Sequence, residues 1–122
     1  MKRSGFRRHK YGAIKTTVGD LVFPSKLEAT GYKELLLLEK SGIIKDLELQ
    51  KELVLTVEGR QVCIYYPDYF FTKTCNGKQT VGEAKGKATA DFRLKWKLAQ
   101  ILYPDYDYML YQRNKWSGSF YK

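Results

Sequence analysis

The sequence predicts a single domain of the α+β or α/β class, a sandwich in which helices flank a central mixed β-sheet. Its 122 residues are enough to bury one modest core and too few for two domains. The composition, 43% hydrophobic and 29% charged, is that of an ordinary globular protein. Two segments have helical periodicity, and the segments around them have strand-like composition separated by turn residues. These observations predict the order hairpin, helix, antiparallel strands, helix and strand.

The N-terminal end predicts a basic arm followed by a β-hairpin. Residues 1–10 are rich in Lys, Arg, Gly and Ser, and we expect them to be flexible, with the folded domain over residues 11–122. Residues 14–18 and 21–23 flank Gly19-Asp20, in which glycine occupies the first position of a two-residue turn. This pattern predicts a short N-terminal β-hairpin.

A first helix is expected between Pro24 and Gly42. Ser25, followed three residues later by Glu28, has the capping-box pattern of a helix start. Gly42 supplies a left-handed C-cap after about Ser41. On a helical wheel Glu28 lies within the apolar stripe, so this acid is expected to face the core.

Extended segments and a second helix follow. Asn76-Gly77 is the strongest hairpin signal in the chain, and Glu58-Gly59 predicts another turn. A helix is expected over residues 89–102, before Pro104, and its apolar residues on more than one face predict a helix covered on two sides. The expected strands are residues 46–50, 52–57, a continuous segment 61–72, 79–85 and 106–112.

The charge is strongly positive and unevenly distributed. Lys and Arg number 22 against 13 Asp and Glu, a net charge of +9. Two basic segments on a near-neutral body predict a polyanionic partner, because neutralising phosphates releases condensed counterions. A solubilising surface with a disordered tail is the alternative. The candidate DNA-binding residues are Lys2, Arg3, Arg7, Arg8 and Lys10 in the first segment and Lys87, Arg93, Lys95 and Lys97 in the second.

Few residues are available for zinc or disulfide chemistry. His9 is the only histidine, and Cys63 and Cys75 are the only cysteines, so four thiolate and imidazole ligands cannot be assembled. We expect both cysteines to be reduced. The longest aliphatic run is residues 35–38, so we expect no membrane span and no signal peptide, and the cytoplasm as the default compartment. The Asp and Glu carboxylates therefore remain as the candidate catalytic or metal-binding groups.

Three of the charged residues are predicted to share one face of a sheet. If the hairpin at Asn76-Gly77 pairs residues whose numbers add up to 151 or 153, Asp68 opposes Glu83 or Lys85. In either register the three side chains lie on one face, with the two carboxylates roughly 5 to 8 Å apart at Cβ. That separation is close enough for both to bind one divalent ion.

Each of these signals also has a purely structural explanation. Asp68, Glu83 and Lys85 could form exposed cross-strand salt bridges, and Asp68 could be a strand-edge residue at a bend after Pro67. The capping box alone could account for Glu28. Only the joint arrangement favours a functional site.

That arrangement resembles the PD-(D/E)XK nuclease superfamily, and within it the small phage endonucleases of the Holliday junction resolvase type. The resemblance covers about residues 20–112. The segment Ser25-Lys26-Leu27-Glu28-Ala29 is similar to the family's helical acid motif, Tyr66-Pro67-Asp68-Tyr69 to its Pro-Asp strand, and Gly82-Glu83-Ala84-Lys85-Gly86 to its Glu-X-Lys strand, with a basic helix after it.

The resemblance implies a restriction-endonuclease-like sandwich and a catalytic role for four residues. Asp68 and Glu83 would bind a metal ion, and Glu28 would complete its shell directly or through water. Lys85 would hold the attacking water and the charge that develops on the phosphate. Oxygen ligands alone favour Mg²⁺ or Mn²⁺. The resemblance assigns no catalytic role to Lys87 or Thr89.

The expected function is therefore a metal-dependent endonuclease for branched DNA such as four-way junctions, in a bacterial or phage-infected cell. Symmetrical cutting of a junction implies a homodimer, for which the sequence offers the second helix and Trp116, Phe120 and Tyr121. Two alternatives remain open. One is a nuclease of the same superfamily with a restriction, repair or transposon-end target. The other is a non-catalytic basic nucleic-acid-binding module whose aromatic residues stack on bases.

Overall fold

The computed structural model describes residues 15–122, so the predicted basic arm and residues 11–14 lie outside the described residues. Two helices and nine strands occur in the described part. In chain order these are β1 (Thr16–Val18), β2 (Leu21–Phe23), α1 (Lys26–Lys40), β3 (Ile44–Leu49), β4 (Leu53–Val57), β5 (Arg60–Tyr65), β6 (Tyr69–Lys73), β7 (Gln79–Ala84), α2 (Ala90–Leu102), β8 (Asp107–Gln112) and β9 (Lys115–Trp116).

A mixed five-stranded sheet lies at the centre of the fold, as predicted. Its strand order is β3-β6-β7-β8-β9. The pairing of β7 with β8 is parallel, because α2 carries the chain back across the sheet between them, and the other pairings are antiparallel. Two hairpins stand apart from this sheet, β1–β2 and β4–β5, and the first confirms the two-residue turn predicted at Gly19-Asp20.

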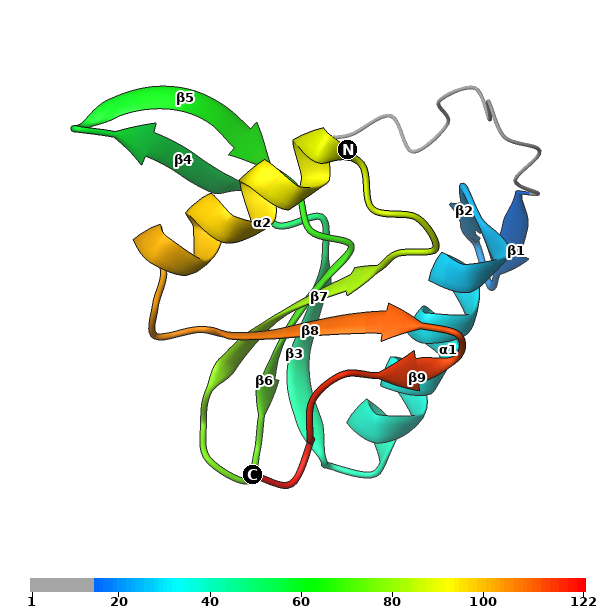
Figure 1. The fold of residues 1–122 in the computed structure, drawn as a ribbon. Coiled ribbons are helices and arrows are strands. Elements are labelled where there is room, and N and C mark those ends of the chain that lie inside the picture. The colour runs from blue at the N-terminus through cyan, green and yellow to red at the C-terminus, as the bar shows by residue number, and fades with distance from the viewer. Residues whose placement is uncertain (1–14) are drawn as a thin grey trace.

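The helices cover opposite faces of the central sheet (Figure 1). One apolar cluster joins Leu35 of α1 to side chains of β6 and β8 such as Phe71 and Met109. The other joins Phe92 of α2 to the β4–β5 hairpin and to Val81 of β7. Neighbouring strand residues therefore alternate between an α1 face and an α2 face.

The first helix starts and ends where the sequence predicts. The Ser25 Oγ accepts a hydrogen bond from the Glu28 N–H at 3.1 Å, and Gly42 follows the helix with φ of 78°. Gly31 is needed inside this helix, because a Cβ there would lie 2.6 Å from the Tyr69 hydroxyl oxygen. The close approach lets the Tyr69 O–H donate to the Glu28 carbonyl oxygen at 2.5 Å. The N-terminal turn of α1 is thereby fixed to the start of β6.

One expectation about the strands is wrong, and one short strand was not expected. The segment predicted as one strand over 61–72 is broken at residues 66–68, so that β5 pairs with β4 and β6 joins the central sheet. Pro67 accounts for the break, because proline has no N–H for a ladder and restricts the residue before it. The two-residue strand β9 was not predicted and pairs with β8.

The second helix is covered on one side only, which corrects the expectation of two covered sides. Phe92 and Ala99 are buried, whereas Leu94 is 69% exposed and Ile101 is 72% exposed. The Thr89 side chain caps this helix by accepting the Phe92 N–H at 3.2 Å, a role that the sequence analysis did not assign.

Cys63 and Cys75 are both free thiols, as predicted. Neither helix in the described part of the chain is long and apolar enough to span a membrane.

Candidate active site at the ends of β6 and β7

The register of the β6–β7 hairpin brings Asp68 and Glu83 together. Tyr69 pairs with Gly82 and Phe70 with Val81. The two residue numbers of each pair add up to 151, which is one of the two predicted registers. Asp68 immediately precedes β6, and Glu83 follows Gly82 in β7. The two acids therefore lie opposite each other where the hairpin pairing ends.

Asp68 is held against β7 by its own side chain. It is 3% exposed, and its Oδ2 accepts a hydrogen bond from the Ala84 N–H at 2.9 Å. The break at Pro67 allows this, because the chain leaves the sheet just before Asp68 and its carboxylate turns toward the neighbouring strand. The bond fixes the position of one carboxylate beside the other.

Glu83 is buried beside Asp68 and has a raised pKa. It is 5% exposed, its Oε1 accepts a hydrogen bond from the Tyr65 hydroxyl at 2.6 Å, and its Oε2 lies 3.5 Å from the Lys85 Nζ. Burial and the neighbouring Asp68 raise the pKa of Glu83 to about 8, although Lys85 and the Tyr65 hydrogen bond act to lower it. A cation bound close to this carboxylate would stabilise its ionised form.

Lys85 is positioned by three parts of the fold. Its backbone N–H donates to the Tyr111 carbonyl oxygen of β8 at 3.1 Å. Its Nζ lies near Glu83 and 4.4 Å from the centroid of the Phe92 ring of α2. The ammonium group is thus held beside Glu83, and the Lys85 side chain is half-buried.

The burial of both acids excludes exposed cross-strand salt bridges as the explanation of the pair. Two carboxylates that are each less than a tenth exposed repel each other unless a proton or a cation lies between them. The donor set is oxygen only, which suits Mg²⁺ or Mn²⁺, and Mg²⁺ in proteins is often held by one or two carboxylates together with water and substrate phosphate. Asp68 and Glu83 fit such an ion.

Glu28 lies on the α1 side of the central sheet. It belongs to α1, whereas Glu83 and Lys85 lie on the side of α2. Its carboxylate is close enough to act on Tyr69, whose pKa is raised by burial and then by Asp68, Glu28 and Glu83. Among residues 15–122, no three His, Cys, Asp or Glu side chains are grouped to hold a metal ion. A place for Glu28 in the ion's shell stays a prediction.

The sequence analysis missed two tyrosines at the site. Tyr65 donates to Glu83, and Tyr69 ties α1 to β6 below the two acids. Both lie in segments of strand-like composition, and both are at most 5% exposed. For Tyr65 no sequence signal was available, because it lies before the break at Pro67 and belongs to another sheet than Glu83.

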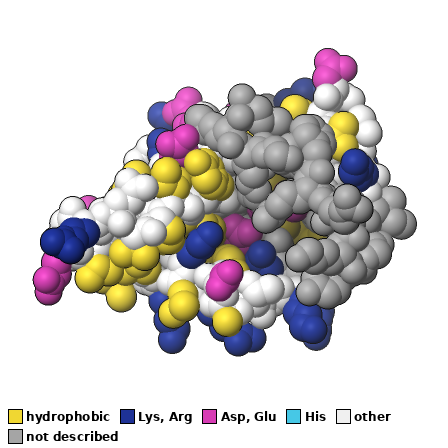
Figure 2. All heavy atoms as spheres, turned by 90° about the horizontal axis from the view of Figure 1, so that it is seen from above, with side chains coloured by type: hydrophobic (Ala, Val, Ile, Leu, Met, Phe, Trp, Pro, Cys, Tyr) yellow, Lys and Arg dark blue, Asp and Glu magenta, His cyan; other side chains and the backbone are white. Residues whose placement is uncertain are grey.

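The predicted DNA-binding residues divide into three groups. Lys87, Arg93 and Lys97 are exposed, and the last two are four residues apart on α2, so they share one side of the helix. Lys95 is half-buried. The residues of the arm, from Lys2 to Lys10, lie outside the described residues. Figure 2 shows Asp and Glu atoms between Lys and Arg side chains near the middle of the face seen from above.

Comparison with known proteins gives a family and no function. No curated protein matches the chain. The family described as "Protein of unknown function (DUF1064)" matches residues 8–118. Because this match covers most of the 122 residues, the chain belongs to the DUF1064 family.

Proposed function

We propose that this protein is a metal-dependent endonuclease with a restriction-endonuclease-like fold of the PD-(D/E)XK type, and that it cleaves branched DNA, with the four-way junction as the principal substrate. The observation that carries the proposal is the buried pair of Asp68 and Glu83 with Lys85 beside Glu83. A purely structural pair would be expected at the surface or matched by cations on both acids.

Asp68 and Glu83 would hold a Mg²⁺ or Mn²⁺ ion, and Glu28 would complete its shell directly or through water. When bound, such an ion supplies Lewis-acid activation of the attacking water and neutralises charge on the phosphate. The raised pKa of Glu83 supports this assignment, because a divalent ion between two buried acids would offset the repulsion that helps to raise it.

Residues of the chain itself would stabilise charge at the reacting phosphate and position the two acids. Lys85 would place a positive charge where negative charge develops, and its half-buried position strengthens that effect. Tyr65 favours the ionised form of Glu83 and lowers its pKa, because its O–H donates to the carboxylate. Ala84 holds Asp68 through its backbone N–H.

Branched DNA is proposed because the basic residues are suited to contacts with the phosphate backbone and do not recognise particular bases. Recognition would then be by shape. Two cuts in one junction need two sites, so we propose a homodimer, and a bacterial or phage-infected cell as its setting. Trp116 and Phe120 do not supply the interface, because they pack in the core against each other. Leu94 and Ile101, exposed seven residues apart on α2, are better candidates.

Cleavage of a labelled junction tests the proposal. The protein is incubated with a fluorescein-labelled four-way junction, a matched duplex and a single strand, each with Mg²⁺, Ca²⁺ or EDTA. We expect cutting of the junction in Mg²⁺ only. Cutting of the duplex instead would favour a restriction or repair nuclease. Binding of all three DNAs with no cutting in Mg²⁺ would favour the non-catalytic module.

A further inference from the structure

A second feature lies next to the acid pair, on the side of the β8–β9 turn. The surface there encloses a hollow of about 450 Å³, and Lys85 belongs to its lining as well as to the acid pair. The other polar lining residues come from the end of β8, the turn and β9: Gln112, Arg113, Lys115 and Ser117. The hollow and the candidate active site therefore share Lys85.

The lining is cationic. It contains the three positive side chains Lys85, Arg113 and Lys115 and no acidic one. Neither Arg113 nor Lys115 forms an ion pair with any acid of residues 15–122, whereas the buried Lys73 pairs with Asp107. Unopposed cations around a concave surface favour an anion, and guanidinium and ammonium groups together suit phosphate.

The turn that carries Arg113 is strained. Arg113 and Asn114 have φ of 51° and 60°, so both occupy the left-handed region. Asparagine tolerates that region, but arginine is disfavoured there, and glycine is the usual residue. Backbone strain of this kind is concentrated at functional sites, because the surrounding structure must hold it. The turn therefore holds Arg113, one of the lining residues of the hollow, in a backbone conformation that arginine disfavours.

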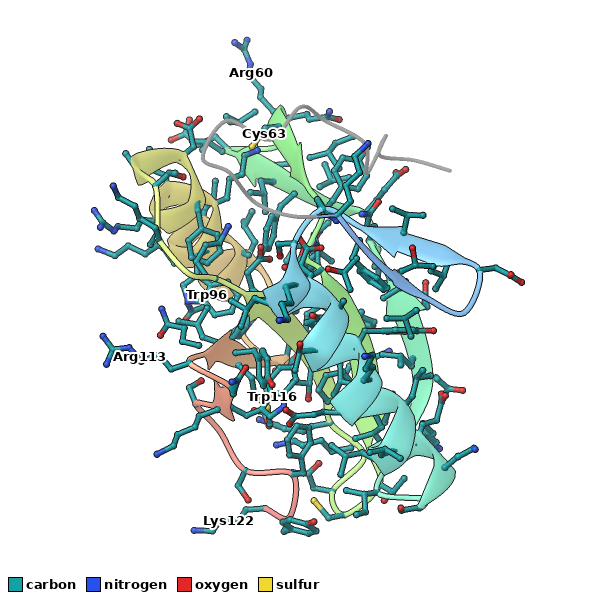
Figure 3. The ribbon with its side chains drawn as sticks, turned by 90° about the vertical axis from the view of Figure 1, so that its right-hand side faces the viewer. Arg60, Cys63, Trp96, Arg113, Trp116 and Lys122 are labelled. Atoms are coloured by element: carbon teal, nitrogen blue, oxygen red, sulfur yellow. The ribbon has the colours of Figure 1, made fainter. Side chains whose placement is uncertain are left out.

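Trp116, which follows the turn, is held in place by contacts with the body of the protein. Trp116, which also lines the hollow, donates its indole N–H to Glu34 Oε1 at 3.3 Å, and its ring centroid lies 4.6 Å from that of Tyr111. Figure 3 shows Trp116 lying against the body of the protein and Arg113 extending away from it. The side chain of Arg113 thus projects from a fixed base.

We propose that this hollow binds the phosphate backbone of the cleaved DNA strand next to the scissile phosphate, with Arg113 and Lys115 as its main contacts. Lys85 links the two positions, because it belongs to both. The inference rests on the proposed function for the identity of the strand, and it adds the path along which that strand leaves the acid pair.

Two double variants with equal loss of charge test it. Arg113→Gln with Lys115→Gln removes the cations of the hollow. Arg60→Gln with Lys45→Gln removes two exposed cations elsewhere, and Figure 3 shows Arg60 at the far tip of the β4–β5 hairpin. Affinity for a fluorescein-labelled four-way junction is measured in Ca²⁺ from 50 to 200 mM salt. We expect the first pair to make the dependence of log affinity on log salt shallower by about 0.9 for each lost phosphate contact, and the control pair to leave it near wild type.

Arg113→Gly separates binding from folding. Glycine relieves the left-handed strain, so the melting temperature should be kept or raised, while affinity for the junction falls. Equal losses in the two double variants, or wild-type affinity in Arg113→Gly, would overturn the inference. Failure of the proposed function gives a different result: a wild-type protein that does not cut in Mg²⁺ but whose affinity still depends on Arg113 and Lys115 more than on the control pair. Such a protein would bind a strand in the hollow without being a nuclease.

Discussion

Raising the pH from 6 to 8 should weaken the fold in the absence of divalent ions, because Glu83 must then lose its proton inside the protein. Burial and the neighbouring Asp68 raise the pKa of Glu83 from 4.5 to about 8. The folded state therefore binds this proton more tightly than the unfolded state does. The stability that this provides is complete below pH 4.5 and is lost progressively as the pH rises to about 8.

The size of the effect follows from the same shift. One pKa unit corresponds to about 1.4 kcal/mol, so two pH units inside this window should lower the free energy of unfolding by about 2 to 3 kcal/mol. For a domain of 122 residues such a change lowers the melting temperature by roughly 10 °C. Glu83→Gln keeps the shape of the side chain and cannot titrate, so its stability should be nearly flat over the same range.

The assay is urea denaturation of wild type and Glu83→Gln at pH 6, 7 and 8, in EDTA and in 10 mM Mg²⁺. Other titrating groups, His9 included, are common to both proteins and cancel in the difference. Mg²⁺ should restore much of the wild-type stability at pH 8 and little of that of the variant, because the ion replaces the proton between the acids. Parallel pH profiles for the two proteins would refute the assignment of a raised pKa to Glu83.

Three further perturbations test other parts of the site. Glu28→Gln keeps the N–H that Ser25 caps but loses charge, so it should melt within a few degrees of wild type and cleave a junction far more slowly; normal cleavage would leave Glu28 a capping residue only. Tyr65→Phe removes the hydroxyl that lowers the pKa of Glu83, so the pH at which cleavage is half-maximal should rise, and an unchanged pH profile would show that the hydrogen bond has no part in activity. Deletion of residues 1–10 should weaken junction binding and make its salt dependence shallower by up to about 0.9 for each lost phosphate contact; an unchanged slope would show that these residues do not touch DNA.

The pairing of the acids was predictable because a tight hairpin limits the register. The turn signal at Asn76-Gly77 allowed sums of 151 or 153, and both placed Asp68 and Glu83 on one face. The structure has the sum of 151. The helix ends were also predictable, since Ser25 and Gly42 act locally through their own backbone and side-chain preferences.

What the sequence could not show depends on contacts between distant segments. The residues on both sides of Pro67 have strand composition, and only the partners of β5 and β6 decide that they belong to two sheets. The helical wheel placed Glu28 on the apolar side of its helix, but it could not tell which face of the sheet that helix covers. The strand β9 is two residues long, too short for any periodicity to reveal. The hollow beside it was missed for that reason.

Single-turnover cleavage of a labelled four-way junction by wild type and Asp68→Asn, in Mg²⁺ and with protein in excess, tests the nuclease assignment most directly. The substitution keeps size and shape and removes one charge from the buried pair. We expect the rate constant to fall by several orders of magnitude, while affinity for the junction in Ca²⁺ is kept or increased because less negative charge faces the phosphates. Wild-type cleavage by Asp68→Asn would contradict the proposal that Asp68 and Glu83 form the metal site of a nuclease.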